Sequence, residues 1–589
     1  MMSVMAYTPY GAGGIIIRVE ADIRRGIPGV DITGLAEGAV REARERVRVA
    51  FRNSGFGFPS DRILINLAPA GLRKDGAALD LPIALAVMAA AGLAPVPESL
   101  LVMGELELSG RIRPVRGVLA AIASGLEEGI GEFIVPAENA REAAILAGER
   151  RGAGPARFTA AATLQEAVEA LFVRAQSGEL PMPKLDGPAD TEPCLMDASA
   201  AGDFADVRGQ DGYKRVLEIA AAGGHNVLVF GPPGAGKTML ARLMPSIMAP
   251  LTPDEAVEVT RLYSLAGPHK AGEGVSRNGG FIDRLITRPP FRAPHHSASA
   301  EGILGGGRFP RPGEISLAHF GVLFLDEAPE FRSNVLQALR EPMEDHVISI
   351  VRAEGPARLP AEFQLLLAAN SCPCGRLGAR KPQDERNMKN SAARRGPGAA
   401  YGRAATSGAV SAAGALYDEL TADEAADCFC SPEEIYRYWR KFGGALLDRL
   451  ELRAAVLPPK ISEMGRRDEA GGERGVDIAK RVLAAVEIQR RRYRGTGIRR
   501  NALLTAGRME ALCPMSERAE SAFHKAMERL GLSGRAYHGI LRVARTIADL
   551  EGEEVIDTAH ILEAVQHRRR GEDPFEILTI ENVEGLKRD

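Results

Sequence analysis

The stretch Gly231-Pro-Pro-Gly-Ala-Gly-Lys-Thr238 follows an apolar run, Asn226–Phe230, and precedes a segment with helical spacing. A strand, a glycine-rich turn and a helix together make a phosphate-binding loop, because the backbone N–H groups and the helix N-terminus face the phosphate. Lys237 would reach the β- and γ-phosphates, and Thr238 would place its hydroxyl on Mg²⁺. ATP and Mg²⁺ are therefore the expected cofactors, and the expected nucleotide contacts are Gly231, Pro232, Pro233, Gly234, Ala235, Gly236, Lys237 and Thr238.

Two further strand ends supply polar groups for hydrolysis. The apolar run Val322–Leu325 ends in Asp326 and Glu327. Asp326 would sit beside Mg²⁺, and Glu327 would orient and polarise the attacking water. Asn370 ends the next apolar run along the chain, Phe363–Ala369, where its amide can bond the water or the γ-phosphate. These motifs, in this order, predict an ATP-hydrolysing protein.

Two arginines are candidates for stabilising the charge of the transition state. Arg449 follows a short helix-like segment and can project across a subunit boundary to a neighbour's γ-phosphate, which is worth about 10³–10⁵ in rate. Arg535 begins the predicted helix Arg535–Leu550 and would reach the nucleotide from a helical lid, with Arg542 as the alternative. The alternative for each of these arginines is a solvated side chain on the protein surface with no role in hydrolysis.

Composition limits the class of protein. A chain of 589 residues is too long for one hydrophobic core, and a net charge of −3 gives no global attraction to nucleic acid, so any DNA contact must be local. The longest apolar run, Ile83–Val96, is too short to span a membrane, and the first residues lack a signal-peptide pattern. Six cysteines without an export signal indicate free thiols or a metal site. We expect a cytoplasmic protein with no membrane partner.

The pattern along the chain predicts an α/β protein of several domains. Residues 1–175 alternate short β-like runs, such as Ile15–Val19 and Ile63–Asn66, with helical patterns. A linker at 176–205 is rich in Pro, Gly, Asp and Ser. The nucleotide domain is expected at 206–475, with an insertion at Leu262–Ser316 and a mobile basic loop at 375–427; a small helical domain is expected at 476–589.

Two Cys-x-Cys pairs flank that basic loop: Cys372 and Cys374 before it, Cys428 and Cys430 after it. Four thiolates would form a tetrahedral Zn²⁺ site that clamps the two ends of the loop. Free reduced thiols are the alternative, because this spacing is a weaker signal than Cys-x-x-Cys. The adjacent pair His295-His296 favours polar loop structure or a nucleic acid contact over a metal site.

A predicted hairpin spans His346–Phe363, with Arg352 and Arg358 flanking its turn. In a ring it would face the pore, where cations can follow a phosphate backbone. A surface hairpin with solvated arginines is the alternative.

Taken together, these segments resemble the magnesium-chelatase-like AAA+ proteins of the ComM/YifB type over nearly the whole chain. The resemblance is carried by GPPGAGKT, FRAPHHSAS, GEISLAHFGVLFLDE, AANSCPCG, SPEEIYRYWRKFGGALLDRLEL and SGRAYHGILRVARTIADLEG. It implies a hexameric ring with a helix-2 insert and a pre-sensor hairpin, and, for ComM-type members, a DNA helicase that promotes branch migration during natural transformation. It also implies roles for Lys237 and Thr238 (Walker A), Asp326 and Glu327 (Walker B), Asn370 (sensor 1), Arg449 (arginine finger) and Arg535 (sensor 2). The family joins its cysteine pairs by a shorter link, so residues 376–427 suggest an added contact arm.

The N-terminal domain resembles the Lon-protease/ribosomal-S5 α+β fold, and the C-terminal helices resemble an AAA+ helical lid of the magnesium-chelatase type. Lys74–Asp80 aligns with the nucleophile loop of the protease, but Ala78 stands at the serine position and Leu119 where a lysine is expected. Peptide hydrolysis then has no nucleophile and no base. A ring-forming or DNA-binding platform is the expected role.

Three interpretations of the motor follow. The first is an ATP-driven DNA translocase or branch-migration helicase on single-stranded or branched DNA. The second is a metal-chelatase motor subunit, and the third is a MoxR-like ATPase that remodels a protein partner.

Overall fold

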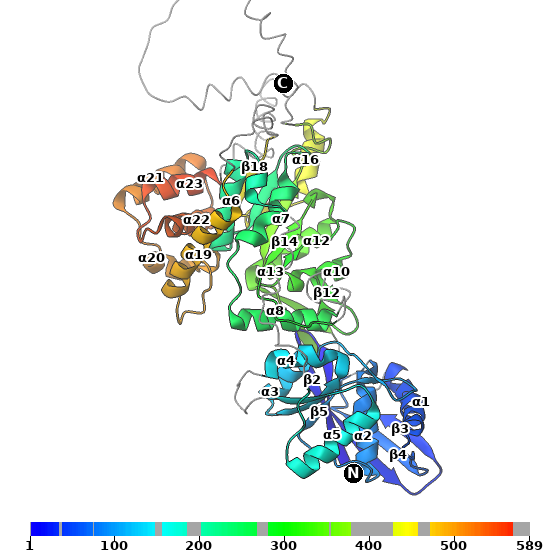
Figure 1. Ribbon diagram of the computed structural model, residues 1–589. Coiled ribbons are helices and arrows are strands. Elements are labelled where there is room, and N and C mark those ends of the chain that lie inside the picture. Colours follow the sequence, from blue (N-terminus) through cyan, green and yellow to red (C-terminus); the bar gives the residue numbers. More distant parts are fainter. Residues whose placement is uncertain are drawn as a thin grey trace, which may run out of the picture.

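The computed structural model describes residues 2–34, 38–72, 74, 76–147, 156–184, 202–267, 281–352, 355–377, 428–457 and 472–568. Of the basic loop predicted at 375–427, residues 378–427 lie outside these ranges. Figure 1 shows an N-terminal α/β unit in blue and cyan, a second α/β unit in green and yellow, and a group of orange and red helices beside the second unit.

The N-terminal unit is built on a seven-stranded sheet in the order β3-β4-β2-β1-β5-β8-β9. The long hairpin β1–β2 provides its centre, and β2 and β4 confirm the predicted strands. α2 is buried along almost its whole length, as its continuous apolar sequence requires. The strands are β1 Met2–Tyr10, β2 Gly13–Arg24, β3 Gly29–Thr33, β4 Arg62–Ala68, β5 Leu100–Val102, β6 Glu105–Leu106, β7 Ile112–Arg113, β8 Glu132–Pro136 and β9 Arg157–Ala161. The helices are α1 Gly38–Asn53, α2 Asp80–Ala90, α3 Val118–Glu127, α4 Ala140–Ala147 and α5 Leu164–Ser177.

The second unit contains a parallel five-stranded sheet in the order β11-β14-β17-β10-β18. β10, β14 and β17 are buried at every position, as expected for parallel strands covered on both faces. Because the strands are parallel, the loops after β10, β14 and β17 meet at one edge. The strands are β10 Val227–Phe230, β11 Phe291–Arg292, β14 Val322–Leu325, β17 Gln364–Ala369 and β18 Leu452–Ala455. The helices are α6 Asp211–Gly223, α7 Lys237–Ile247, α8 Pro253–Ala266, α10 Ala300–Leu304, α11 Glu314–Leu317, α12 Ser333–Ala338, α13 Arg340–Asp345, α16 Pro432–Arg440 and α17 Gly444–Leu447.

Within the insertion expected at Leu262–Ser316, the residues up to Ala266 form the end of α8. It contains the small hairpin β12 (Gly305–Gly306) with β13 (Arg311–Pro312). The other predicted hairpin is present as β15 (Val347–Arg352) and β16 (Gly355–Pro360).

The two α/β units are joined by polar contacts. Ser264 on α8 donates its hydroxyl to the buried carboxylate of Glu142 on α4, and the Gly117 N–H donates to the Ser264 carbonyl over 3.1 Å. Tyr10, at the end of β1, donates its hydroxyl to the Gly355 carbonyl over 2.7 Å. The tip of the β15–β16 hairpin therefore touches the first hairpin of the N-terminal unit.

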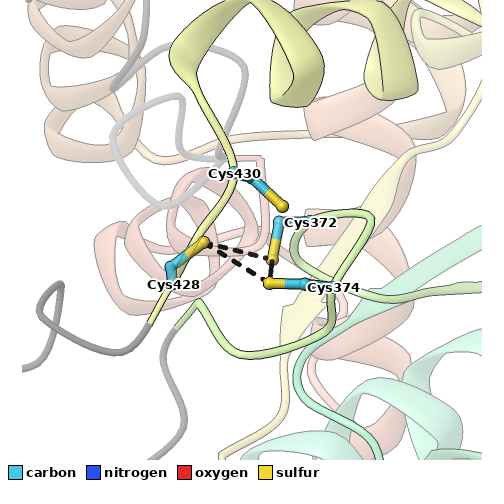
Figure 2. Close-up of side chains that lie close together, drawn as sticks. All are labelled: Cys372, Cys374, Cys428 and Cys430. Atoms are coloured by element: carbon cyan, nitrogen blue, oxygen red, sulfur yellow. Dashed lines mark hydrogen bonds between the residues drawn. The ribbon is translucent and has the colours of Figure 1, made fainter.

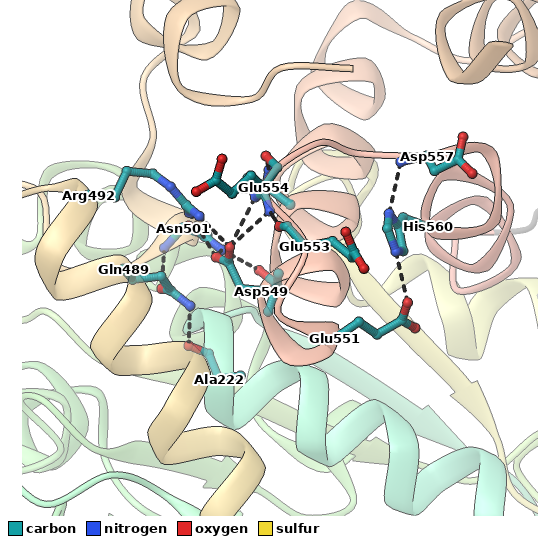
Figure 3. A network of polar contacts seen from close by, with 12 residues as sticks. Ala222, Gln489, Arg492, Asn501, Asp549, Glu551, Glu553, Glu554, Asp557 and His560 are labelled. Atoms are coloured by element: carbon teal, nitrogen blue, oxygen red, sulfur yellow. Dashed lines mark hydrogen bonds and ion pairs between the residues drawn. The ribbon is translucent and has the colours of Figure 1, made fainter. Parts of the chain in front are cut away.

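The C-terminal helices pack on the second unit through a shared core and a buried polar network (Figure 3). Asp549 on α22 accepts from Arg492 over 2.9 Å, from Arg545 over 3.1 Å and from Asn501 over 2.8 Å. Gln489 on α19 donates to the Ala222 carbonyl of α6 over 3.1 Å, which ties these helices to the sheet unit. The helices are α19 Gly475–Arg492, α20 Ala506–Leu512, α21 Glu517–Leu530, α22 Gly534–Glu551 and α23 Thr558–Gln566. Across the described ranges, no helix is long and apolar enough to cross a membrane.

Candidate functional site

The phosphate-binding loop follows β10, and its backbone requires glycine. A Cβ on Gly231 would lie 2.0 Å from the Val456 carbonyl oxygen, so no larger residue fits without displacing the end of β18. Gly234 and Gly236 adopt left-handed φ angles of +77° and +88°, which L side chains rarely adopt. The turn then leads directly into α7, whose first residue is Lys237.

The ammonium group of Lys237 is held inside this turn. Its Nζ donates to the carbonyls of Gly231 and Pro232 over 2.7 and 2.9 Å, and to Oδ1 of Asn370 over 3.2 Å. Burial lowers the pKa of Lys237, although the carboxylates of Asp326 and Glu327 oppose this effect. The structure thus brings the predicted lysine and asparagine together from β10 and β17.

The predicted metal-binding pair also meets. The Thr238 hydroxyl donates to Oδ2 of Asp326 over 2.7 Å. A hydroxyl and a carboxylate beside a phosphate loop are oxygen ligands of the kind that Mg²⁺ takes, and they would hold it beside bound phosphates. The donor set therefore fits a Mg²⁺–nucleotide.

Glu327 has a left-handed φ of +49° and an exposed carboxylate. Its Oε2 lies 3.6 Å from Nδ1 of His296, in the loop after β11. The adjacent histidines in the sequence favour loop structure or a nucleic acid contact, and they give no sign of the proximity of His296 to Glu327. The strand that positions the loop of His296 could not be predicted from its apolar residues, because β11 has only two residues.

Arg449 and Arg535 lie elsewhere. Both contact the carboxylate of Glu344 on α13: Arg449 through an ion pair and Arg535 over 3.0 Å. Arg449 precedes β18, whereas the phosphate loop follows the parallel strand β10. The four residues of β10 span about 13 Å, so Arg449 and the loop lie at opposite edges of the sheet. The alternative residue, Arg542, faces Glu451 at 3.6 Å.

The four cysteines converge (Figure 2). Gly375, next to Cys374, packs against Pro233 of the phosphate loop. The sulfur of Cys374 is 3.3 Å from that of Cys372 and 3.6 Å from that of Cys428, and the four sulfurs all lie within 4.8 Å of one another. Tetrahedral thiolates around Zn²⁺ at 2.3 Å would be about 3.8 Å apart. The cluster can therefore hold a metal ion, and its donor set is that of a structural zinc site.

The loop that resembles the Lon nucleophile loop has a structural role in this chain. Lys74 is buried and donates to the carbonyls of Gly34 and Leu67 over 2.9 and 3.0 Å. Asp80 is buried and paired with Arg46 over 2.8 Å. Ala78 has no nucleophilic group, so the described residues of this loop provide no acyl-transfer centre.

Comparison with known proteins gives matches along almost the entire chain. The YifB protein of Salmonella typhimurium is 36% identical over 557 residues, covering 94% of this chain and 94% of its own. Competence protein ComM of Haemophilus influenzae is 35% identical over 561 residues, covering 95% of each chain. The chain belongs to the magnesium-chelatase-like ComM/YifB family.

Family models agree with this assignment. The model "Magnesium chelatase, subunit ChlI" matches residues 203–395, "Subunit ChlI of Mg-chelatase" matches 19–139, and "Magnesium chelatase, subunit ChlI C-terminal" matches 472–568. The Lon protease of Salinispora arenicola is 27% identical over 186 residues, or 30% of this chain. Membership in the magnesium-chelatase-like family indicates an ATPase.

Proposed function

We propose that the chain is an AAA+ DNA motor that hydrolyses ATP, a branch-migration helicase that acts on recombination intermediates in natural transformation. It would work in the cytoplasm as a hexameric ring. Its domains would be the Lon/S5-like unit at 1–175, the linker at 176–205, the ATPase core at 206–475 and the helical lid at 476–589.

The observation that carries the proposal is the meeting of four predicted groups at one sheet edge, in the pairs Lys237–Asn370 and Thr238–Asp326. In the proposed mechanism Lys237 would bind the β- and γ-phosphates, and Thr238 and Asp326 would hold Mg²⁺. Glu327 would orient and polarise the attacking water, and Asn370 would bond that water or the γ-phosphate.

The arginines support assembly. Arg449 and Arg535 are too far from their own phosphate loop to act there, and they share one carboxylate on the opposite edge of the sheet. If that edge faces the phosphate loop of the next subunit, both arginines reach its γ-phosphate. A ring would therefore complete each site with groups from two chains.

DNA as the substrate is supported by the name of the relative ComM, a competence protein. The β15–β16 hairpin carries Arg352 and Arg358, which would contact the phosphate backbone of DNA and move with the ATP cycle. Because its tip contacts Tyr10, the N-terminal unit would then lie next to the proposed DNA path. Zn²⁺ at the four cysteines completes the proposed set of cofactors.

The test is ATP hydrolysis without DNA, with single strands and with four-way junctions, using Lys237→Ala as the blank. Strong stimulation by junctions, absent in the blank, supports the proposal, and Arg352→Ala with Arg358→Ala should abolish that stimulation. Stimulation that survives this double change would exclude the hairpin as the DNA contact.

The alternative is a chelatase-like or MoxR-like ATPase that remodels a protein partner. It is favoured by the three family models, all of which describe a magnesium-chelatase subunit. Hydrolysis that is indifferent to every DNA would select this alternative.

A further inference from the structure

We propose that the four-cysteine cluster is a zinc site that positions Asn370 at the phosphate loop, so that metal occupancy sets the rate of ATP hydrolysis. This inference rests on the proposed ATPase function. Bound Zn²⁺ would supply a rigid tetrahedral link between two chain segments that are distant in sequence.

The first cysteine pair continues directly from the sensor strand. Cys372 is two residues beyond Asn370, and the Gly375 N–H closes a turn on the Cys372 carbonyl over 3.0 Å. Gly375 packs on the phosphate loop so closely that a Cβ there would lie 2.9 Å from Cδ of Pro233. A displacement of Cys372 and Cys374 would therefore shift both Asn370 and the phosphate loop.

The second pair leads into a helix that holds the same segment. Ser431 directly follows Cys430 and caps α16. On α16, the Tyr438 hydroxyl accepts from the Asn370 N–H over 3.3 Å, and the Trp439 indole N–H donates to the Ser371 carbonyl over 3.0 Å. The backbone on both sides of the Asn370–Ser371 peptide is thus fixed by α16.

The sulfurs of the two pairs meet, and beside them the Arg376 guanidinium lies 5.2 Å from the ring centroid of Phe429. Cys374 and Cys428 are 54 positions apart in the chain, but their sulfurs are 3.6 Å apart. Thiol–thiol contacts are weak, since a thiol is a poor donor and a poor acceptor. A metal bond is far stronger, and its binding energy becomes folding energy for the segments that supply the ligands. Without the metal, α16 and the sensor turn would keep the hydrogen bonds of Tyr438 and Trp439 but lose the metal link, and Asn370 would be held less firmly at its position 3.2 Å from Lys237.

The experiment uses the full chain and measures zinc content, Trp439 fluorescence and basal ATPase activity without DNA. Trp439 is the single tryptophan and is completely buried, so its emission reports on this segment alone. We expect about one zinc per wild-type chain. In Cys428→Ser we expect zinc loss, a red shift of the Trp439 emission and a decrease in kcat of about 10- to 100-fold, the range usual for groups that orient a site from outside it. Cys513→Ser, a buried cysteine in the helical unit, should retain zinc and activity.

Two further variants separate positioning from general damage. Cys428→His offers a three-cysteine, one-histidine donor set and should restore zinc and most of the activity. In the Asn370→Ala background, Cys428→Ser should cause little further decrease in kcat, because the group that the metal positions is already absent.

Three results would overturn the inference. They are a wild-type chain without zinc, zinc loss that leaves kcat unchanged, or a Cys428→Ser change that lowers kcat by the same factor with and without Asn370→Ala. If the wild-type chain hydrolyses no ATP, the proposed function fails and this inference fails with it. Zinc content and fluorescence would still show whether the cluster binds metal, so the two failures can be told apart.

Discussion

Arg449 provides a sharp test of the two-chain site. It lies beyond the reach of its own phosphate loop, because β10 alone separates the two edges by about 13 Å. Arg449→Ala should therefore lower kcat by about 10³–10⁵ while leaving ATP affinity nearly unchanged. Arg440→Ala, an exposed arginine on α16, is the matched control and should have no such effect.

Mixing two inactive variants gives the decisive measurement. A Lys237→Ala chain retains its arginine, and an Arg449→Ala chain retains its phosphate loop. In a ring that assembles both at random in equal amounts, about one site in four combines an intact loop with an intact arginine from the next subunit. ATPase activity should rise from near zero to at most about a quarter of the wild-type rate. Mixed rings, verified by native mass spectrometry, that remain as inactive as either variant would refute the reasoning.

Three smaller predictions concern stability. In each, the free energy of unfolding of the nucleotide and helical units is measured by denaturant titration of the full chain. Gly231→Ala should cost about 2–4 kcal/mol because its Cβ would meet the Val456 carbonyl, just after β18, at 2.0 Å, whereas Gly234→Ala has open space and should cost about 1–2 kcal/mol. Burial lowers the pKa of His225 to about 3, so only the unfolded chain takes up that proton as pH falls below 6.5. Between pH 6.5 and about pH 3 the free energy of unfolding should then decrease by up to about 1.4 kcal/mol per pH unit. His225→Gln should remove this contribution to the pH dependence of stability. Asp549→Asn should cost about 3–5 kcal/mol because buried arginines lose their carboxylate, and a loss no larger than that of the exposed Asp477→Asn would contradict this account.

The sequence predicted the elements that carry strong local signals. The strand before the phosphate loop and the strand before Asp326 are confirmed, because each is a short apolar run beside an unmistakable polar motif. The four cysteines of the predicted cluster do converge, although their spacing alone left free, separate thiols as an alternative. The Zn²⁺ itself remains a prediction.

The missed features depend on contacts between distant segments. His296 lies close to Glu327 because β11 pairs with β14. A strand of two residues is too short to show the alternation of apolar and polar residues that would predict it. The common contact of Arg449 and Arg535 with Glu344 joins three segments far apart in the chain. The burial of Glu142 against Ser264 likewise requires two α/β units to be docked together.

The closeness of Cys374 and Cys428 has a practical consequence for protein engineering. Because the sulfurs of Cys374 and Cys428 lie only 3.6 Å apart across 54 positions of the chain, the segment that joins them can be shortened without straining the sheet. A short linker could replace residues 378–427, and a fluorescent domain or an affinity tag could be inserted there. Such fusions would carry their probe close to the phosphate-binding loop, on which Gly375 packs.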